Sequence, residues 1–141
     1  MRVLCCGDRK WKDRELIRHA LSGIGLYPVI IEGEAEGADL LARQVAEQIG
    51  FEVMPFPAQW TRYSRSAGPI RNQQMLNEGK PDLVIAFHDN LLGRSKGTKD
   101  MVLRAVLAGV PVKVVRHERK KRTPKEELQF ENQFEDPDDQ E

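Results

Sequence analysis

The chain carries no net charge and very little cysteine. Its 22 Lys and Arg residues balance 22 Asp and Glu residues, so bulk electrostatics do not make the whole chain a binder of polyanions. The two cysteines, Cys5 and Cys6, are neighbours in an expected strand and should point to opposite faces, which disfavours a disulfide between them. No cysteine spacing indicates a zinc site. We therefore expect buried, reduced cysteines, no metal and no cofactor.

Long hydrophobic runs are also missing. No apolar stretch has the length of a signal peptide or a membrane span, which predicts a cytoplasmic protein without a membrane partner. With 141 residues, 40% of them hydrophobic, the chain can form one domain with a core. We predict this domain over residues 1–116. A charged, flexible C-terminal tail over residues 117–141 should follow, basic at its start and acidic from Glu126 onward.

Short apolar runs alternate with helical patterns along the predicted domain. The expected strands are residues 2–6, 28–32, 52–56, 83–87 and 111–115. The expected helices are residues 13–24, 38–49, 69–78 and 98–108. This alternation predicts an α/β fold, a doubly wound parallel sheet of about five strands with helices on both faces. The predicted strand order 3-2-1-4-5 places a switch point between the first and fourth strands, where such sheets bind ligands at the carboxyl ends of their strands.

The segment from Ser66 to Asn72 carries the strongest signal for a binding site. Its Gly68-Pro69 pair predicts a helix that begins at or near Pro69, because proline suits the first helical position. Helix N-termini carry unpaired N–H groups and a partial positive charge. Arg71 adds a planar guanidinium that matches phosphate or carboxylate. The segment therefore predicts one half of an anion site.

Other loops that follow strands should reach the same edge of the sheet. Gly33 and Gly37 allow backbone N–H groups to approach a ligand, and Asp39 falls in the first turn of the next helix. Gly97 and Thr98 combine a glycine and a hydroxyl at another helix start. Neither loop has the dinucleotide-binding or P-loop pattern. The residues expected to bind the ligand are Gly7, Asp8, Arg9, Gly33, Gly37, Ala38, Asp39, Trp60, Gly68, Arg71, Asn72, Gly97 and Thr98.

Several of these residues also have a purely structural explanation. Asp8 and Arg9 fit a surface turn, and Asp39 fits a carboxylate at a helix N-terminus. Trp60 could cap the core, although an aromatic ring in a polar loop could equally stack on a base. Their expected gathering at one edge of the sheet favours the binding hypothesis.

These motifs resemble those of a known family. Over nearly all of residues 2–115 the chain is similar to the YspA/cpYpsA-related branch of the SLOG superfamily. The resemblance implies a Rossmann-like domain related to the LOG phosphoribohydrolases and to the DNA-processing protein DprA, a nucleotide or nucleotide-derived ligand, and a homodimer. The motifs that carry it are Gly7-Asp8-Arg9, Gly33-x-x-x-Gly37-Ala38-Asp39, Ala67-Gly68-Pro69-Ile70-Arg71-Asn72 and Gly97-Thr98-x-Asp100.

The chain departs from the family pattern at positions that matter for chemistry. Glu34 and Glu36 stand where the family usually has a glycine and a basic residue, and they repel phosphate unless they turn outward or serve chemistry. LOG enzymes place a catalytic glutamate three residues after the loop threonine, where this chain has Met101. Asp100 comes one residue earlier, a rotation of about 100° on a helix. We expect Asp100 to face another direction, which counts against LOG-type hydrolysis.

Three functions are compatible with this pattern. The first is binding, or sensing, of a nucleotide-derived ligand at the carboxyl ends of the strands, with Trp60 or Tyr63 against the base. The second is N-glycosidic hydrolysis of a nucleoside monophosphate, which needs a carboxylate near the sugar. The third is a nucleic-acid-associated module like DprA, which basic residues 116–122 favour and the acidic segment after them disfavours. The candidate catalytic residues of the second hypothesis are Asp39, Arg71 and Asp100, with Glu36 as a further carboxylate.

Overall fold

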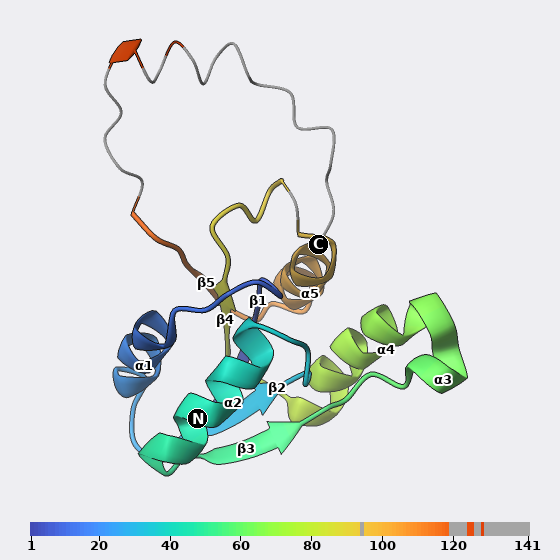
Figure 1. Ribbon diagram of the computed structural model, residues 1–141. Helices are drawn as coiled ribbons and strands as arrows, with labels where there is room; N and C mark the ends of the chain where they lie inside the picture. The colour runs from blue at the N-terminus through green and yellow to red at the C-terminus, as the bar shows by residue number, and fades with distance from the viewer. Residues whose placement is uncertain (94, 119–123, 126–127, 129–141) are drawn as a thin grey trace.

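Five parallel strands form the single sheet of the domain in the computed structural model, which describes residues 1–93, 95–118, 124–125 and 128 (Figure 1). The sheet order is β3-β2-β1-β4-β5, so the predicted fold class and strand order are confirmed. The strands are β1 (Arg2–Gly7), β2 (Val29–Glu32), β3 (Glu52–Pro55), β4 (Leu83–Phe87) and β5 (Val112–Val115). The α-helices are α1 (Arg14–Ser22), α2 (Ala38–Ile49), α3 (Trp60–Tyr63), α4 (Ala67–Gln74) and α5 (Lys96–Leu107).

Helices cover both faces of the sheet, as its continuous apolar strands require. In β1, Val3 and Cys5 pack with α1 and α2, whereas Leu4 and Cys6 pack with α5 and the helical turn after α4 (Figure 1). The two cysteines therefore point to opposite faces, and both are free and buried. Burial raises the pKa of the Cys5 thiol well above its ordinary value, so this group stays a buried apolar side chain.

The helix that contains Pro69 begins earlier than the sequence predicts. α4 starts at Ala67, after a short α3 and a 3-10 turn over Ser64–Ser66, in a stretch expected to be a loop. The backbone N–H of Ala67 donates to the carbonyl of Ser64, so the chain is already wound when it reaches Pro69. Proline is tolerated anywhere in a first helical turn because its missing N–H is not needed there. The motif therefore marks the first turn of the helix rather than its first residue.

The loops after β1 and β2 support one another at the carboxyl ends of the strands. The backbone N–H of Ala38 donates to the carbonyl of Asp8 at 3.0 Å, and the N–H of Asp8 donates to the carbonyl of Phe87 at 2.9 Å. Gly37 has a φ of 79°, and a Cβ there would overlap the backbone of Asp8 and Arg9. These contacts fix both loops beside the switch point between β1 and β4, which is where the sheet order places a ligand site.

The chain after β5 returns to the domain at His117. The His117 ring stacks on Trp11 with 4.7 Å between centroids, and its two nitrogens lie 2.9 Å from Asp89 Oδ2 and 2.8 Å from Asp13 Oδ2. Most of residues 117–141 lie outside the described residues, so the boundary at residue 116 and the flexible tail stay predictions. Within the described part of the chain, no helix is long and apolar enough to cross a membrane.

We predict that Gly37→Ala destabilises the protein strongly. The substitution places a side chain at positive φ and against fixed backbone, so the free energy of unfolding should fall by roughly 2–4 kcal/mol. Urea denaturation followed by circular dichroism measures this change. Gly23→Ala is the matched control, because a Cβ at Gly23 meets nothing within 4 Å; it should change stability by less than about 1 kcal/mol. Equal effects of the two substitutions would contradict the packing argument.

Candidate functional site

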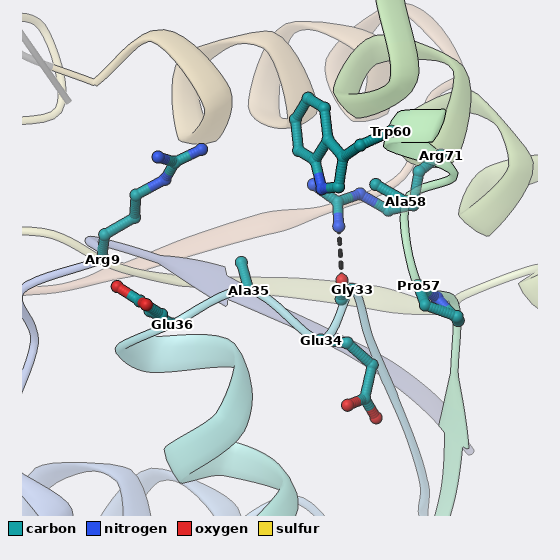
Figure 2. Close-up of a pocket in the computed structure, with 9 residues that line it drawn as sticks. All are labelled: Arg9, Gly33, Glu34, Ala35, Glu36, Pro57, Ala58, Trp60 and Arg71. Carbon is teal, nitrogen blue, oxygen red and sulfur yellow. Dashed lines mark hydrogen bonds between the residues drawn. The ribbon is translucent and has the colours of Figure 1, made fainter. Parts of the chain in front are cut away.

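Two adjoining cavities lie at the carboxyl ends of the strands, and most of the predicted site residues line them. The inner cavity, about 180 Å³, lies between the end of β1, α4 and the start of α5. The outer cavity, about 610 Å³, lies between the loop after β2 and the loop that leads into α3 (Figure 2). Arg9, Ala35 and Arg71 line both. The inner cavity is also lined by Cys6, Gly7, Asp39, Asn72, Met75, Lys96, Gly97, Thr98 and Met101, and the outer by Gly33, Glu34, Glu36, Pro57, Ala58 and Trp60.

Arg71 lies at the junction of the two cavities and holds the loop after β2. Its Nη1 donates to the carbonyl of Gly33, and its Nε donates to Asn72 Oδ1 at 3.0 Å (Figure 2). A Cβ at Gly33 would lie 2.5 Å from Arg71 Nη1 and 2.9 Å from Asp39 Oδ2, so only glycine lets the guanidinium approach this closely. Within the described residues, Arg71 Nη2 has no acceptor. Arg71 therefore combines a structural contact with donors left over for a ligand.

Asp39 is buried in the inner cavity at the first turn of α2. Its Oδ2 accepts hydrogen bonds from the backbone N–H of Gly33 at 3.1 Å and of Ala35 at 3.3 Å. Burial raises the pKa of Asp39 to about 6, while the charge of Arg71 and the two backbone hydrogen bonds act in the opposite direction. The carboxylate is thus mainly ionised at neutral pH, and it shapes the loop from Gly33 to Ala35.

Asn72 connects α4 to α5 through Asp100. Its Nδ2 donates to Asp100 Oδ2 at 2.9 Å and to the carbonyl of Gly97 at 3.4 Å. Arg104 Nε also donates to Asp100 Oδ2, at 2.8 Å. Asp100 lines neither cavity, whereas Met101 lines the inner one. The candidate catalytic residue Asp100 is therefore held by Asn72 and Arg104 and is not among the residues that line the two cavities.

The first turn of α5 opens into the inner cavity. The hydroxyl of Ser95, the residue before the helix, donates to the carbonyl of Leu91, and its side chain caps no helical N–H. Lys96, Gly97 and the buried Thr98 then line the cavity. A Cβ at Gly97 would meet nothing within 4 Å, so packing within the described chain does not require glycine there. Because the Ser95 side chain does not cap this turn, the positive end of the helix faces the cavity and suits an anion.

Four predicted ligand-binding residues do not line either cavity. Gly37 and Ala38 pack against the loop after β1. Gly68 packs against Trp60, because a Cβ added at Gly68 would lie 3.6 Å from Trp60 Cη2. Asp8 lines a separate hollow with Trp11 and His117. Pro69 is also absent from the two linings, whereas Lys96, Gly97 and Thr98 at the start of α5 line the inner cavity.

Glu32, at the end of β2, is a functional candidate that the sequence pattern did not predict. This side chain is fully buried; its Oε2 accepts from the backbone N–H of Glu34, while Oε1 has no partner within the described residues. Burial raises the pKa of Glu32 to about 9, helped by the negative charges of the nearby Glu34 and Asp39 carboxylates. The sequence signal that could have predicted it is an acidic residue at the end of an otherwise apolar strand. Glu32 is thus a neutral carboxylic acid under the loop after β2.

The two acidic departures from the family pattern have different positions. Glu34, with a φ of 61°, forms an ion pair with Arg43 of α2, and its side chain points away from Trp60 (Figure 2). Glu36 is exposed and lines the outer cavity on the side of Arg9, across from Pro57 (Figure 2). Both line the outer cavity, but the Glu34 carboxylate is paired with Arg43, whereas Glu36 has no ion pair within the described residues. No group of His, Cys, Asp and Glu in the described part of the chain could hold a metal ion.

Comparisons with known proteins agree with this architecture. The model of the YspA, cpYpsA-related SLOG family matches residues 1–63. The chain is 40% identical over 122 residues to the Gene 61 protein of Mycobacterium phage D29. This match covers 79% of this chain and 93% of the phage protein. DNA processing protein A (DprA) from Streptococcus pneumoniae has a similar structure, with a TM-score of 0.68 and 17% identity over 83% of this chain. This chain spans 50% of the DprA chain, and the likeness concerns the fold alone.

We predict that Glu32→Gln changes how stability depends on pH. The raised pKa means that unfolded Glu32 releases its proton near pH 4.5 while folded Glu32 keeps it, so the free energy of unfolding of the wild type falls as pH rises toward about 9. Glutamine does not titrate and can still accept from the N–H of Glu34. Relative to the wild type, the variant should gain stability with increasing pH, by up to roughly 1 kcal/mol per pH unit.

Urea denaturation of both proteins at pH 5, 7 and 9 measures this difference. A difference that stays constant over the three pH values would show that Glu32 is ionised in the folded state.

Proposed function

The chain belongs to the YspA, cpYpsA-related SLOG family, and on that premise we propose that it binds a nucleotide or a nucleotide-derived ligand in its two adjoining cavities. The observation that carries this proposal is the inner cavity, where an uncapped helix start meets three cationic side chains. The phosphate lies there, and the base lies in the outer cavity. We assign this activity to the cytoplasm, as the reduced cysteines predict.

The charges around the inner cavity support a phosphate. Arg9, Arg71 and Lys96 line it together with the N-terminal turn of α5. Arg9 and Lys96 are exposed and have no ion pair within the described residues, so both are available to an anion. A volume of about 180 Å³ is below the roughly 300–1,000 Å³ of typical ligand pockets, which suits a phosphate better than a base.

The outer cavity supports the rest of a nucleotide. Its volume of about 610 Å³ lies within the range of ligand pockets. Trp60 stands at its edge with half of its surface exposed, although tryptophan is a residue that usually buries most of its ring. A base stacked on this indole would remove apolar surface of both groups from water, and stacking of this kind contributes about 1–3 kcal/mol.

N-glycosidic hydrolysis is the second candidate, and the observation that favours it is Asp39. This carboxylate lines the inner cavity with a pKa of about 6, in the range of catalytic acids and bases. However, its Oδ2 already accepts two backbone hydrogen bonds, and Asp100 is bound to Asn72 and Arg104 outside both cavities. We therefore rank binding above cleavage. Release of free base from a nucleoside monophosphate, lost in Asp39→Asn, would reverse that order.

A nucleic-acid-associated role rests on the structural likeness to DprA and on basic residues 116–122, most of which lie outside the described residues. The site of the described residues is a pair of small cavities, whereas non-specific binding of single strands uses a basic groove that follows the backbone. Binding to a single-stranded oligonucleotide with strong salt dependence, and no competition by nucleotides, would favour this role over the proposed one.

We predict that Arg9→Gln weakens nucleotide binding roughly tenfold. A charge-assisted hydrogen bond contributes about 1.5–3 kcal/mol, and about 1.4 kcal/mol corresponds to a factor of ten in Kd. Isothermal titration with nucleoside mono- and diphosphates and with NAD-derived compounds measures this loss. Lys113→Gln is the control, because it removes the same charge from β5 without touching either cavity. If the folded wild type binds none of these compounds, the proposed function is wrong.

We predict that Gly97→Ala reduces binding and leaves the fold intact. A methyl group at Gly97 enters open space at the start of α5 and raises helix propensity, so the free energy of unfolding should stay equal or increase by up to about 1 kcal/mol. The same methyl group blocks close approach of a phosphate to the backbone, so Kd should rise at least tenfold. Thermal unfolding and titration on one sample separate the two effects. Unchanged affinity would place the phosphate elsewhere.

A further inference from the structure

We propose that Glu36 selects the ligand of this site, which is a nucleoside 5′-phosphate with both ribose hydroxyls free. The inference rests on the proposed function and adds to it the chemical class of the ligand. Its basis is the placement of charged side chains: Glu36 lines the outer cavity alone, Lys96 lines the inner cavity alone, and Arg9 and Arg71 line both.

Glu36 is the available carboxylate of the outer cavity because Glu34 is already neutralised. Glu34 forms an ion pair with Arg43, which also binds Glu47 at 3.0 Å. Glu34 also points away from Trp60 (Figure 2). Glu36, in contrast, has no ion pair or hydrogen bond within the described residues, not even with Arg9. Its acceptor oxygens are therefore free for a ligand.

The backbone on either side of Glu36 is fixed, so its Cβ has a defined place beside the cavity. The N–H of Ala35 donates to Asp39 Oδ2, and Gly37 lies directly against the backbone of Asp8 and Arg9. A residue held between two such neighbours keeps its Cβ at a constant position relative to the cavity. Binding then has to order only the side chain of Glu36 and not the loop that carries it, which lowers the entropy cost.

The chemistry that matches this arrangement is a cis-diol. An ionised carboxylate only accepts hydrogen bonds, and its two oxygens can accept one from each of two neighbouring hydroxyls. With the 5′-phosphate in the inner cavity and the base on Trp60, the ribose lies where the cavities meet, beside the shared residues Arg9 and Ala35 and next to Glu36 in the outer cavity. A 2′-deoxyribose removes one donor, and a phosphate on the 2′ or 3′ oxygen places like charges against each other.

The test compares three ligands that differ only at the ribose. Isothermal titration first identifies the nucleoside 5′-monophosphate that binds the wild type most tightly among those of adenine, guanine, cytosine and uracil. The same base is then titrated as its 2′-deoxy-5′-monophosphate and as its 3′,5′-bisphosphate. We expect the wild type to bind the 5′-monophosphate about tenfold more tightly than the deoxy form and at least about tenfold more tightly than the bisphosphate.

Glu36→Gln should bring both ratios toward one, with the larger change for the bisphosphate. Glu52→Gln is the matched control, because Glu52 is an exposed carboxylate at the first residue of β3, away from both cavities, and it should keep the wild-type ratios. If Glu36→Gln binds all three ligands with wild-type ratios, the inference is overturned while the proposed function stands. If the wild type binds no nucleoside 5′-monophosphate, the inference is overturned; the proposed function fails as well only if the protein also binds none of the nucleoside diphosphates and NAD-derived compounds.

Discussion

The contact of the Arg71 guanidinium with the Gly33 carbonyl is the interaction on which the site depends. It joins α4, on one face of the sheet, to the loop after β2, which leads into α2 on the other face. The positive charge of Arg71 opposes the effect of burial on the pKa of Asp39, and Asp39 in turn holds the N–H groups of Gly33 and Ala35. Removal of the Arg71 guanidinium would leave the buried Asp39 carboxylate without this positive charge. The shape of the loop after β2 and the charge of the site therefore both depend on Arg71.

The fold could be predicted from the sequence because its signals are local and repeated. Val29-Ile30-Ile31 and Leu83-Val84-Ile85 are continuous apolar runs, and each is followed by a helical pattern, which leaves few topologies. The start of α4 was predicted less well, because Pro69 is compatible with every position of a first turn and the winding of residues 60–66 has no apolar periodicity. Element types therefore followed from the pattern, while this boundary depended on contacts that the pattern does not contain.

The sequence predicted which residues lie at the candidate site better than it predicted what each of them does there. Gly33, Arg71 and Gly97 were chosen as ligand contacts, and all three line a cavity. Yet Gly33 is needed for the approach of Arg71, and Gly37 for the approach of the loop after β1. A glycine that faces its own chain and one that faces a ligand look alike in a sequence, since only the three-dimensional neighbours distinguish them. The same limit hid Glu32, whose raised pKa results from burial and from neighbours that the fold brings together.

The distribution of carboxylates argues that this site holds a ligand rather than cleaves it. A hydrolase of N-glycosidic bonds needs a carboxylate that is free to face the developing positive charge on the sugar. In the described residues, Asp39 is engaged by two backbone N–H groups, Asp100 by Asn72 and Arg104, and Glu34 by Arg43. Glu32 is protonated at neutral pH because its pKa is near 9. Among these carboxylates, Glu36 is the one without a hydrogen bond or ion pair within the described residues. It lines the open outer cavity, where water competes for it and where hydrogen bonding to hydroxyls is the chemistry that a solvated carboxylate performs well.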